Sequence, residues 1–301
     1  MMNTYVLKTR LRLLFELPPK VVLQKIRKRF KGHEMDEFVL EDVVEPELTV
    51  NKHLRPQRMI NFLWRYETII RRVQPSWNLN FSGQRVLEVG GGPLLGLAPI
   101  ALFLGCEHYC FVEPSYNARI LEHPKAKEYF RGVHEDLCAL YGERMGLEEF
   151  LRLLKERVYV QKKTLEAFED SETYSIVFSN AVFEHIQDVP AAVQKLKRLS
   201  AENSTFIHLV NFGNHRESEN PFGGLYTRSK EEYWKTYGKG INTLRANDIL
   251  RCLMDAGFST TMIPYVVVER LKERPNEWWK AHHTDDELRC RVALFVNTPT
   301  A

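Results

Sequence analysis

Apolar and polar residues follow two different spacings along this chain, and the change comes near residue 80. Before it, residues 55–73 place apolar side chains at helical intervals, and Pro75 ends the pattern. The apolar positions of this segment are Ile60, Leu63, Trp64, Ile69 and Ile70. After residue 80, short apolar runs typical of strands alternate with helical segments. The alternation predicts a parallel sheet with crossover helices in residues 81–301, behind a helical extension over residues 1–80.

Seven strand-like runs are expected after residue 80. They cover residues 85–89, 108–113, 158–163, 174–180, 205–212, 258–269 and 291–298. Helices are expected over residues 97–105, 115–156, 189–199 and 246–256, and between the last two strands. The pattern leaves the direction of the last strand open. Residues 213–243, rich in Gly, Asn and Tyr, are predicted to be an insertion.

The overall charge is ordinary, but its distribution is not. A net charge of +3 is too small to indicate a nucleic-acid partner. Residues 1–31 nevertheless hold nine basic side chains against the single acid Glu16, with apolar residues between them. Such a segment can be a helix packed on the domain, which we favour, or can rest on an anionic membrane surface.

The five cysteines are odd in number and widely scattered, without a CxxC pair. This usage predicts reduced thiols in a cytoplasmic protein. The longest apolar run, residues 94–105, is far short of the roughly 20 residues that span a bilayer. We therefore expect a cytoplasmic location. Peripheral contact with the inner face of the membrane remains an open alternative.

Three consecutive glycines, Gly90, Gly91 and Gly92, follow the first predicted strand in the stretch RVLEVGGGPLLG. A strand that ends in glycines and feeds a helix brings bare backbone close to a ligand. Glu113, at the end of the next strand, can accept both hydroxyls of a ribose. The pattern fits an adenosine-containing cofactor, and a tight turn without ligand is the alternative.

Glu88 narrows the choice of cofactor. A carboxylate at the strand end suits a ligand with a cationic amino group better than a pyrophosphate. S-adenosylmethionine has both an ammonium and a ribose, and it lacks phosphate. A nicotinamide-dependent oxidoreductase, which would bind a different cofactor and catalyse a different reaction, remains the alternative.

The arrangement Glu88-x-Gly90-x-Gly92 with Glu113 resembles the first two motifs of the class I S-adenosylmethionine-dependent methyltransferases. Residues 174–210 are similar to that family's fourth strand, active-site loop, helix and fifth strand, and residues 244–258 to its late helix. The resemblance covers about residues 80–300. It implies a Rossmann-like, seven-stranded, mostly parallel sheet with helices on both faces.

The resemblance also implies roles for individual residues. Glu88 serves the methionine moiety directly or through water, and Glu113 takes the ribose. The chain departs from the family at Leu94, and after the third strand, where it lacks an acid for the adenine amine. The remaining residues assigned to the cofactor on this basis are Pro114, Thr164, Leu165, Asn180 and Ala181.

Two nucleic-acid methylating classes do not match the chain. The loop after the fourth strand reads Ser179-Asn180-Ala181-Val182 instead of a Pro-Pro-aromatic motif, and no Pro-Cys occurs. We expect O-methylation of a small polar acceptor such as a sugar or glycan, with no nucleic-acid partner. A cofactor-binding protein without activity is the alternative.

A histidine is the expected general base for a hydroxyl acceptor. His215, in a polar loop after the fifth strand, is preferred, and His185 is the second candidate. Substrate contacts are predicted for His208, Asn211, Tyr226 and Arg245. The aromatic and basic residues of the insertion suit a sugar, or else pack on the domain.

No metal is expected at Glu184 and His185. Methyltransferases that resemble this stretch and hold a metal carry an additional acid one turn earlier, where this chain has Ala181. More loosely, the glycine segment, the insertion and the basic N-terminus resemble methyltransferases associated with bacterial surface-polysaccharide pathways. Lipid-linked glycans would give the basic N-terminus a role at a membrane. The oligomeric state is left open.

Overall fold

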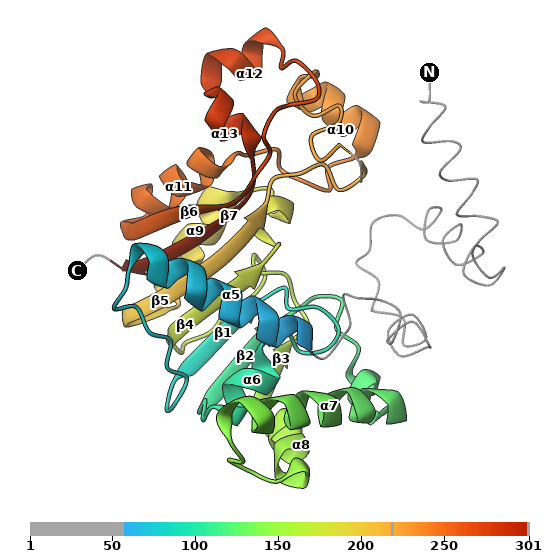
Figure 1. Ribbon diagram of the computed structural model, residues 1–301, viewed down its shortest axis with the longest axis vertical. Coiled ribbons are helices and arrows are strands. Elements are labelled where there is room, and N and C mark those ends of the chain that lie inside the picture. Colours follow the sequence, from blue (N-terminus) through green and yellow to red (C-terminus); the bar gives the residue numbers. More distant parts are fainter. Residues whose placement is uncertain (1–56, 218–219, 300–301) are drawn as a thin grey trace, which may run out of the picture. The chain divides into compact units, whose positions relative to one another are not determined.

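The computed structural model describes residues 57–217 and 220–299, so the predictions for the basic segment 1–31 lie outside the described residues. In the described part, a seven-stranded sheet has the order β3-β2-β1-β4-β5-β7-β6 (Figure 1). The strands are β1 (Arg85–Val89), β2 (His108–Val112), β3 (Val158–Gln161), β4 (Tyr174–Asn180), β5 (Ser200–Asn211), β6 (Phe258–Val267) and β7 (Cys290–Pro299).

The helices lie mainly in the connections where the sequence predicts them. They are α5 (Gln57–Val73), α6 (Ala98–Phe103), η1 (Ala118–Glu122), α7 (Pro124–Tyr141), α8 (Leu147–Glu156), η2 (Phe183–His185), α9 (Val189–Arg198), α10 (Lys230–Tyr237), α11 (Ala246–Asp255), α12 (Glu277–His282) and α13 (Asp285–Arg289). The doubly wound α/β fold predicted from the alternating pattern is thereby confirmed.

The sheet is mostly parallel, as predicted, and the structure shows the direction of the last strand, which the sequence pattern leaves open. Neighbouring strands from β3 through β5 pair in parallel, whereas β7 pairs antiparallel with both β5 and β6. Val267 of β6 pairs with Cys290 of β7, so the residues between them form the tip of a long hairpin. The strand order reverses between β1 and β4. Ligands of such sheets bind outside the carboxyl ends of the strands at that reversal.

Helices cover both faces of the sheet, because the central strands are apolar on both sides. In β1, Val86 belongs to the cluster under α5, α6, α7 and α8, whereas Leu87 and Val89 belong to the cluster under α9 and α11. Figure 1 shows the first group of helices on the near side of the sheet. Successive side chains of a strand point to opposite faces, so Glu88 faces the same side as Val86.

The helix α5 packs on this domain instead of standing apart from it. Its residues Ile60, Leu63, Tyr66 and Ile70 are buried in the same cluster as the sheet. Trp64, which fits the helical spacing equally well, is 42% exposed. A periodic pattern therefore identifies the apolar face of α5 but not how far the neighbouring elements cover it.

The strand β5 begins at Ser200, five residues earlier than the polar sequence suggests. Ser200 pairs with Tyr174, and the register with β4 then shifts before Ile176. Asn203 has a φ of +62°, and its left-handed conformation accommodates the irregularity. The polar residues at the start of β5 therefore belong to a strand with a bulge.

A third apolar cluster lies outside the two sheet faces. It joins Tyr226 and Tyr233 of the predicted insertion to Trp279 and Leu288 of the hairpin tip between β6 and β7. In Figure 1, α10, α12 and α13 lie together beyond the end of the sheet. The aromatics of the insertion therefore largely pack on the domain. Of the two sequence predictions for them, binding a sugar or packing on the domain, the structure favours the second.

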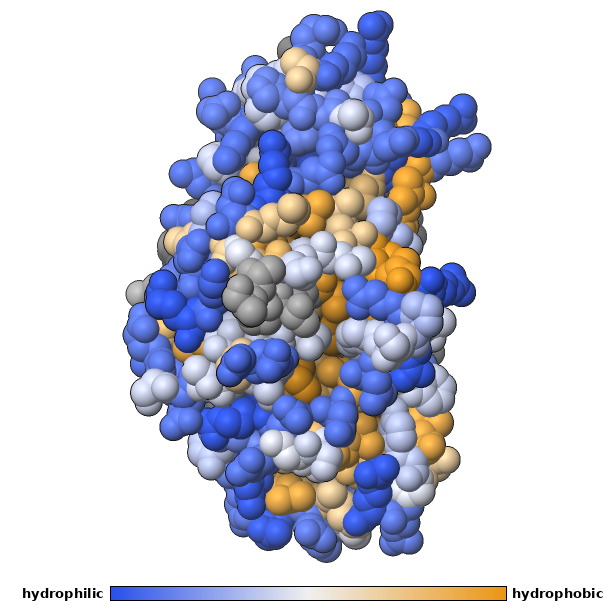
Figure 2. Space-filling model, turned by 90° about the vertical axis from the view of Figure 1, so that its left-hand side faces the viewer, coloured by the Kyte–Doolittle hydropathy of each residue, from blue (hydrophilic) through white to orange (hydrophobic). Residues whose placement is uncertain are grey.

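One face of the molecule has a mainly polar surface. Figure 2 shows that hydrophilic residues cover most of one face, with apolar residues gathered in a band near and below its middle. Within residues 57–217 and 220–299, no helix has both the length and the apolar composition that crossing a bilayer requires.

Candidate functional site

The residues after β1 form a glycine loop, residues 90–96, that leads into α6. Gly90 and Gly92 have φ values of +72° and +79°, a left-handed conformation that favours glycine. The amide of Gly90 donates to the carbonyl of Val112 at 2.9 Å, which ties the loop to the end of β2. A Cβ on Gly90 would overlap the side chain of Val182, so the loops after β1 and β4 touch at the reversal of strand order.

Glu113 lies opposite the glycine loop, as the sequence predicts. Its carboxylate accepts hydrogen bonds of 3.1 Å from the amides of Gly92 and Ser115, one on each oxygen. Burial raises the pKa of Glu113 above its ordinary value, and these two bonds oppose the shift. Each carboxylate oxygen retains a free lone pair, so the residue fits a ligand that presents two hydroxyls.

Glu88 has a different position from the one expected. Its side chain is completely buried, and one oxygen accepts from the hydroxyl of Tyr109 at 2.7 Å and from the amide of Leu97 at 3.0 Å. Burial raises its pKa to about 7. In this structure the side chain faces the core, which closes a direct contact between Glu88 and a ligand ammonium, and its service to the methionine moiety through water stays a prediction. The carboxylate supports the glycine loop from beneath.

Two glycines of the loop lie directly against this carboxylate. A Cβ on Gly91 would approach Glu88 to 2.8 Å, and one on Gly96 would overlap its carboxylate. Gly96 and Tyr109 belong to this site although the sequence motifs do not indicate them. Strand alternation could have placed Tyr109 on the same face as Glu88, but it contains no information about their hydrogen bond.

The other residues assigned to the cofactor lie at neighbouring strand ends. Asn180 ends β4, and Ala181 follows with a φ of +57°, a conformation that costs a non-glycine residue on the order of 1 kcal/mol. Pro114 follows Glu113 and is half-buried. Beyond β3, Thr164 accepts from the amide of Ala167 at 3.3 Å, whereas Leu165 is buried in the core under α9. Their contacts with a cofactor stay predictions.

The two histidines proposed as bases lie side by side. The ring centroids of His185 and His215 are 5.1 Å apart, and the ring planes meet at 63°. His215 Nε2 lies 3.9 Å from the carboxylate of Glu184, which is 3% exposed. Burial lowers the pKa of His215, and positive charge from Arg216 acts in the same direction. Burial also raises the pKa of Glu184 to about 8.

A cavity of about 320 Å³ lies over these histidines. We call it the acceptor cavity. Its wall includes His185, His215, Arg216, and Tyr233 and Tyr237 of α10. The loop after β4 links it to the glycine loop, because Val182 contacts Gly90 while His185, three residues later, lines the cavity.

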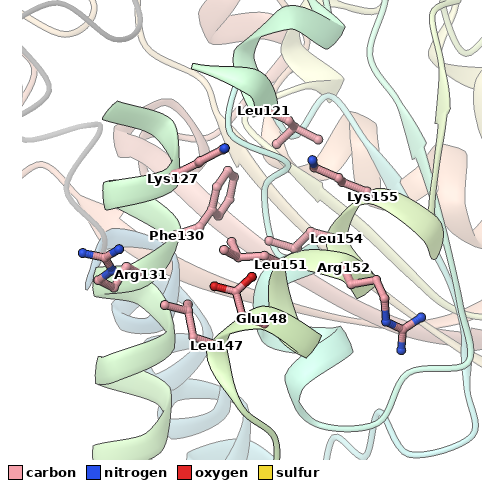
Figure 3. A pocket seen from close by; sticks show the side chains of 10 residues that line it. All are labelled: Leu121, Lys127, Phe130, Arg131, Leu147, Glu148, Leu151, Arg152, Leu154 and Lys155. Carbon is pink, nitrogen blue, oxygen red and sulfur yellow. The ribbon is translucent and has the colours of Figure 1, made fainter. Parts of the chain in front are cut away.

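A second cavity, of about 360 Å³, lies between α7 and α8 (Figure 3). Phe130 and several leucines line it, with Lys127, Arg131 and Lys155 among its basic residues. It contains none of the site residues predicted from the sequence. We therefore place the candidate site at the carboxyl ends of the strands and not here.

Three of the four residues assigned to the substrate need correction. His208 is 1% exposed on β5, where its Nδ1 bonds with the hydroxyl of Ser179 at 2.8 Å, and burial lowers its pKa to about 3. Tyr226 and Arg245 are each 1% exposed, and the Arg245 guanidinium donates to the Tyr226 hydroxyl at 3.1 Å. In this structure these side chains belong to the core, so they cannot contact a substrate.

Asn211 differs from these three because it stays half-buried at the end of β5. Its side chain accepts from the amide of Gly213 at 3.0 Å, and its own amide donates to Glu184 at 3.3 Å. It thereby fixes the turn that carries the chain toward His215. A contact with substrate stays a prediction.

Three solved structures illustrate what the chain is similar to. One is an S-adenosylmethionine-dependent methyltransferase from Mesorhizobium loti, at 10% identity and a TM-score of 0.44, covering 75% of this chain and 96% of that one. Another is the YcgJ protein from Bacillus subtilis, at 12% identity and a TM-score of 0.45, covering 78% and 99%. A third is the N-methyltransferase NodS from Bradyrhizobium japonicum, at 10% identity and a TM-score of 0.38, covering 81% and 99%. No curated protein matches the sequence.

The family match is more decisive than these distant likenesses. The model of a methyltransferase domain matches residues 62–262, well over half of the chain, and includes the glycine loop, Glu113 and the loop after β4. The oxidoreductase alternative is thereby set aside. The chain belongs to this methyltransferase-domain family, and it is a methyltransferase that uses S-adenosylmethionine.

Proposed function

We propose that the protein transfers the methyl group of S-adenosylmethionine to a hydroxyl oxygen of a small polar acceptor, such as a sugar or glycan. The acceptor cavity is the observation that carries this proposal. At about 320 Å³ it is at the small end of ligand pockets, and aromatic, basic and imidazole side chains line it. The face of Tyr237 and the forked donors of Arg216 suit a polar ring with several hydroxyls.

The residues of this chain supply positioning and a base. When bound, S-adenosylmethionine supplies an electrophilic methyl group on a sulfonium. The glycine loop and Glu113 would hold its adenosyl part, and the loop after β4 joins that region to the acceptor cavity. Alignment of the acceptor with the methyl group would then contribute most of the rate.

His215 is suited to accept the proton of the hydroxyl. Its lowered pKa favours the neutral imidazole near pH 7, the form that can take a proton. A base of this kind contributes about 10²–10⁴-fold to the rate.

The experiment pairs S-adenosylmethionine carrying a labelled methyl group with a panel of sugars and their matched amino sugars, and identifies the methylated atom by NMR. We expect the label on oxygen. His215→Ala should reduce kcat by about 10²–10⁴-fold while affinity for S-adenosylhomocysteine stays unchanged. His282→Ala, at an exposed histidine of α12, is the control. Label only on nitrogen, or full turnover of His215→Ala, would overturn the proposal.

The partners that we propose are small molecules or glycans. For the basic segment 1–31, contact with an anionic membrane surface is the alternative to the packed helix that its composition favours. The support for that contact is the composition of the segment alone. Sedimentation with vesicles of anionic lipid should exceed that with neutral vesicles, and about 1 M salt should remove the difference. Equal sedimentation with both would contradict membrane contact.

A further inference from the structure

The imidazoles of His185 and His215 line the acceptor cavity, and the buried carboxylate of Glu184 lies beside them. One possible ligand atom from each of Glu184, His185 and His215 lies within 4.8 Å of the others. Zinc bonds to such atoms are about 2.0–2.2 Å long, which in a tetrahedral site places the ligand atoms about 3.4 Å apart. His215 Nε2 is already within 3.9 Å of Glu184 Oε1. Small side-chain rotations would therefore close the group around an ion.

Glu184 provides a second and independent observation. Its Oε1 accepts from the amide of Asn211 at 3.3 Å, which holds the carboxylate in place. Its Oε2 is buried and has no hydrogen-bond partner among the described residues. A buried carboxylate oxygen without a partner is costly, and a cation bound beside it would remove that cost.

The two histidines are arranged as ligands usually are. The Nδ1 atom of His185 lies 2.5 Å from the carbonyl oxygen of Gly240. We assign the proton to Nδ1 from that contact, which leaves a lone pair on Nε2. A ring that donates one N–H to a carbonyl and ligates through the other nitrogen is the common arrangement at metal sites. His215, with its lowered pKa, also offers a lone pair near neutral pH.

We propose that Glu184, His185 and His215 bind one divalent transition-metal cation, Zn²⁺ above all, at the acceptor cavity. Two imidazoles and one carboxylate suit Zn²⁺ better than Mg²⁺ or Ca²⁺, which prefer oxygen ligands. The sequence predicts no metal here, because Ala181 stands where an additional acid is expected. His215, which the fold brings in from beyond β5, supplies a third ligand that spacing along the chain could not reveal.

The role of this cation in catalysis rests on the proposed function, methyl transfer to a hydroxyl oxygen. Three protein ligands leave an open position on the ion, and a hydroxyl that occupies it has a lowered pKa. In the metal-bound enzyme the cation would then activate the acceptor oxygen, in place of the free imidazole of His215.

The test uses the full, untagged chain, stripped with EDTA and freed of chelator, and titrated calorimetrically with Zn²⁺. We expect one ion per chain. His185→Ala, His215→Ala and Glu184→Gln should each weaken binding at least tenfold. His282→Ala is the matched control, because His282 is exposed and its Nδ1 also contacts a backbone carbonyl, that of Trp278 at 2.8 Å. Absence of saturable binding, or equal binding by all variants, would overturn the inference.

Two further measurements separate this inference from the proposed function. Titration with S-adenosylhomocysteine checks that each variant is folded, and Co²⁺ absorption bands that disappear in His215→Ala support direct ligation. Site-dependent zinc binding without methylation of any hydroxyl acceptor would support the metal site and overturn the proposed acceptor class. Hydroxyl methylation by a protein without saturable zinc binding would overturn the metal site and leave the proposed function standing.

Discussion

The hydroxyl of Tyr109 donates a 2.7 Å hydrogen bond to the carboxylate of Glu88, and both side chains are completely buried. The pair links β2 to β1 directly beneath the glycine loop. The same carboxylate oxygen also accepts from the amide of Leu97, at the start of α6. The cofactor loop is therefore held by a buried polar network, whose loss should affect both stability and ligand binding.

Replacing Tyr109 with Phe should destabilise the fold by about 1–3 kcal/mol, because it removes a donor from a buried carboxylate. Urea unfolding measures the loss, and we expect weaker binding of S-adenosylhomocysteine as well. Tyr116→Phe is the matched control, since its hydroxyl is buried and lacks a hydrogen-bond partner among the described residues. A Tyr109→Phe protein as stable as the control would show that Glu88 does not depend on this bond.

Gly96 should tolerate alanine poorly for two reasons that can be separated. Its φ is +49°, and a Cβ there would overlap the carboxylate of Glu88. Gly83 has a φ of +68° but open space around a Cβ, so Gly83→Ala reports backbone strain alone, about 1–2 kcal/mol. Gly96→Ala should lose about 2 kcal/mol more in urea unfolding, because overpacking adds to the strain. Equal losses in the two variants would contradict the close contact.

Glu113→Gln should weaken binding of S-adenosylhomocysteine roughly tenfold, the scale of one charge-assisted hydrogen bond. The amide keeps one acceptor oxygen for the backbone N–H groups but loses the charge that favours the ribose hydroxyls. Calorimetric titration measures the change. Glu107→Gln, at the exposed residue before β2, removes the same charge far from the carboxyl end of the strand. If both variants bind alike, the ribose lies elsewhere.

The sequence predicts the sheet well because the signals there are local. Apolar runs such as 85–89 and 174–180 are buried on both faces, so their composition alone identifies them as central strands. The polar start of β5 does not have such a signal. Its pairing between Ser200 and Tyr174 depends on a neighbouring strand and on the turn at Asn203.

The site is less accessible to sequence reasoning, because burial of polar groups depends on distant contacts. Arg245 looks like a substrate ligand from its position near an aromatic insertion. Its charge instead lies over the rings of Phe212, Tyr226 and Trp279, each from a different part of the chain. Glu88 likewise has a motif position that predicts ligand contact, whereas strand alternation turns it into the core. Glu113 was placed correctly beside the glycine loop because the ends of adjacent parallel strands meet.

Glu184 makes stability depend on pH in a definite direction. Burial raises its pKa from the ordinary 4.5 to about 8, so between these values the folded protein holds a proton that the unfolded chain releases. Stability therefore falls as pH rises through this range. Urea unfolding at pH 5.5 and 8.5, with EDTA present, should show a larger loss in the natural protein than in Glu184→Gln. The exposed Glu202→Gln should keep the full loss. Identical pH dependence in the natural protein and Glu184→Gln would mean that this carboxyl ionises normally in the fold.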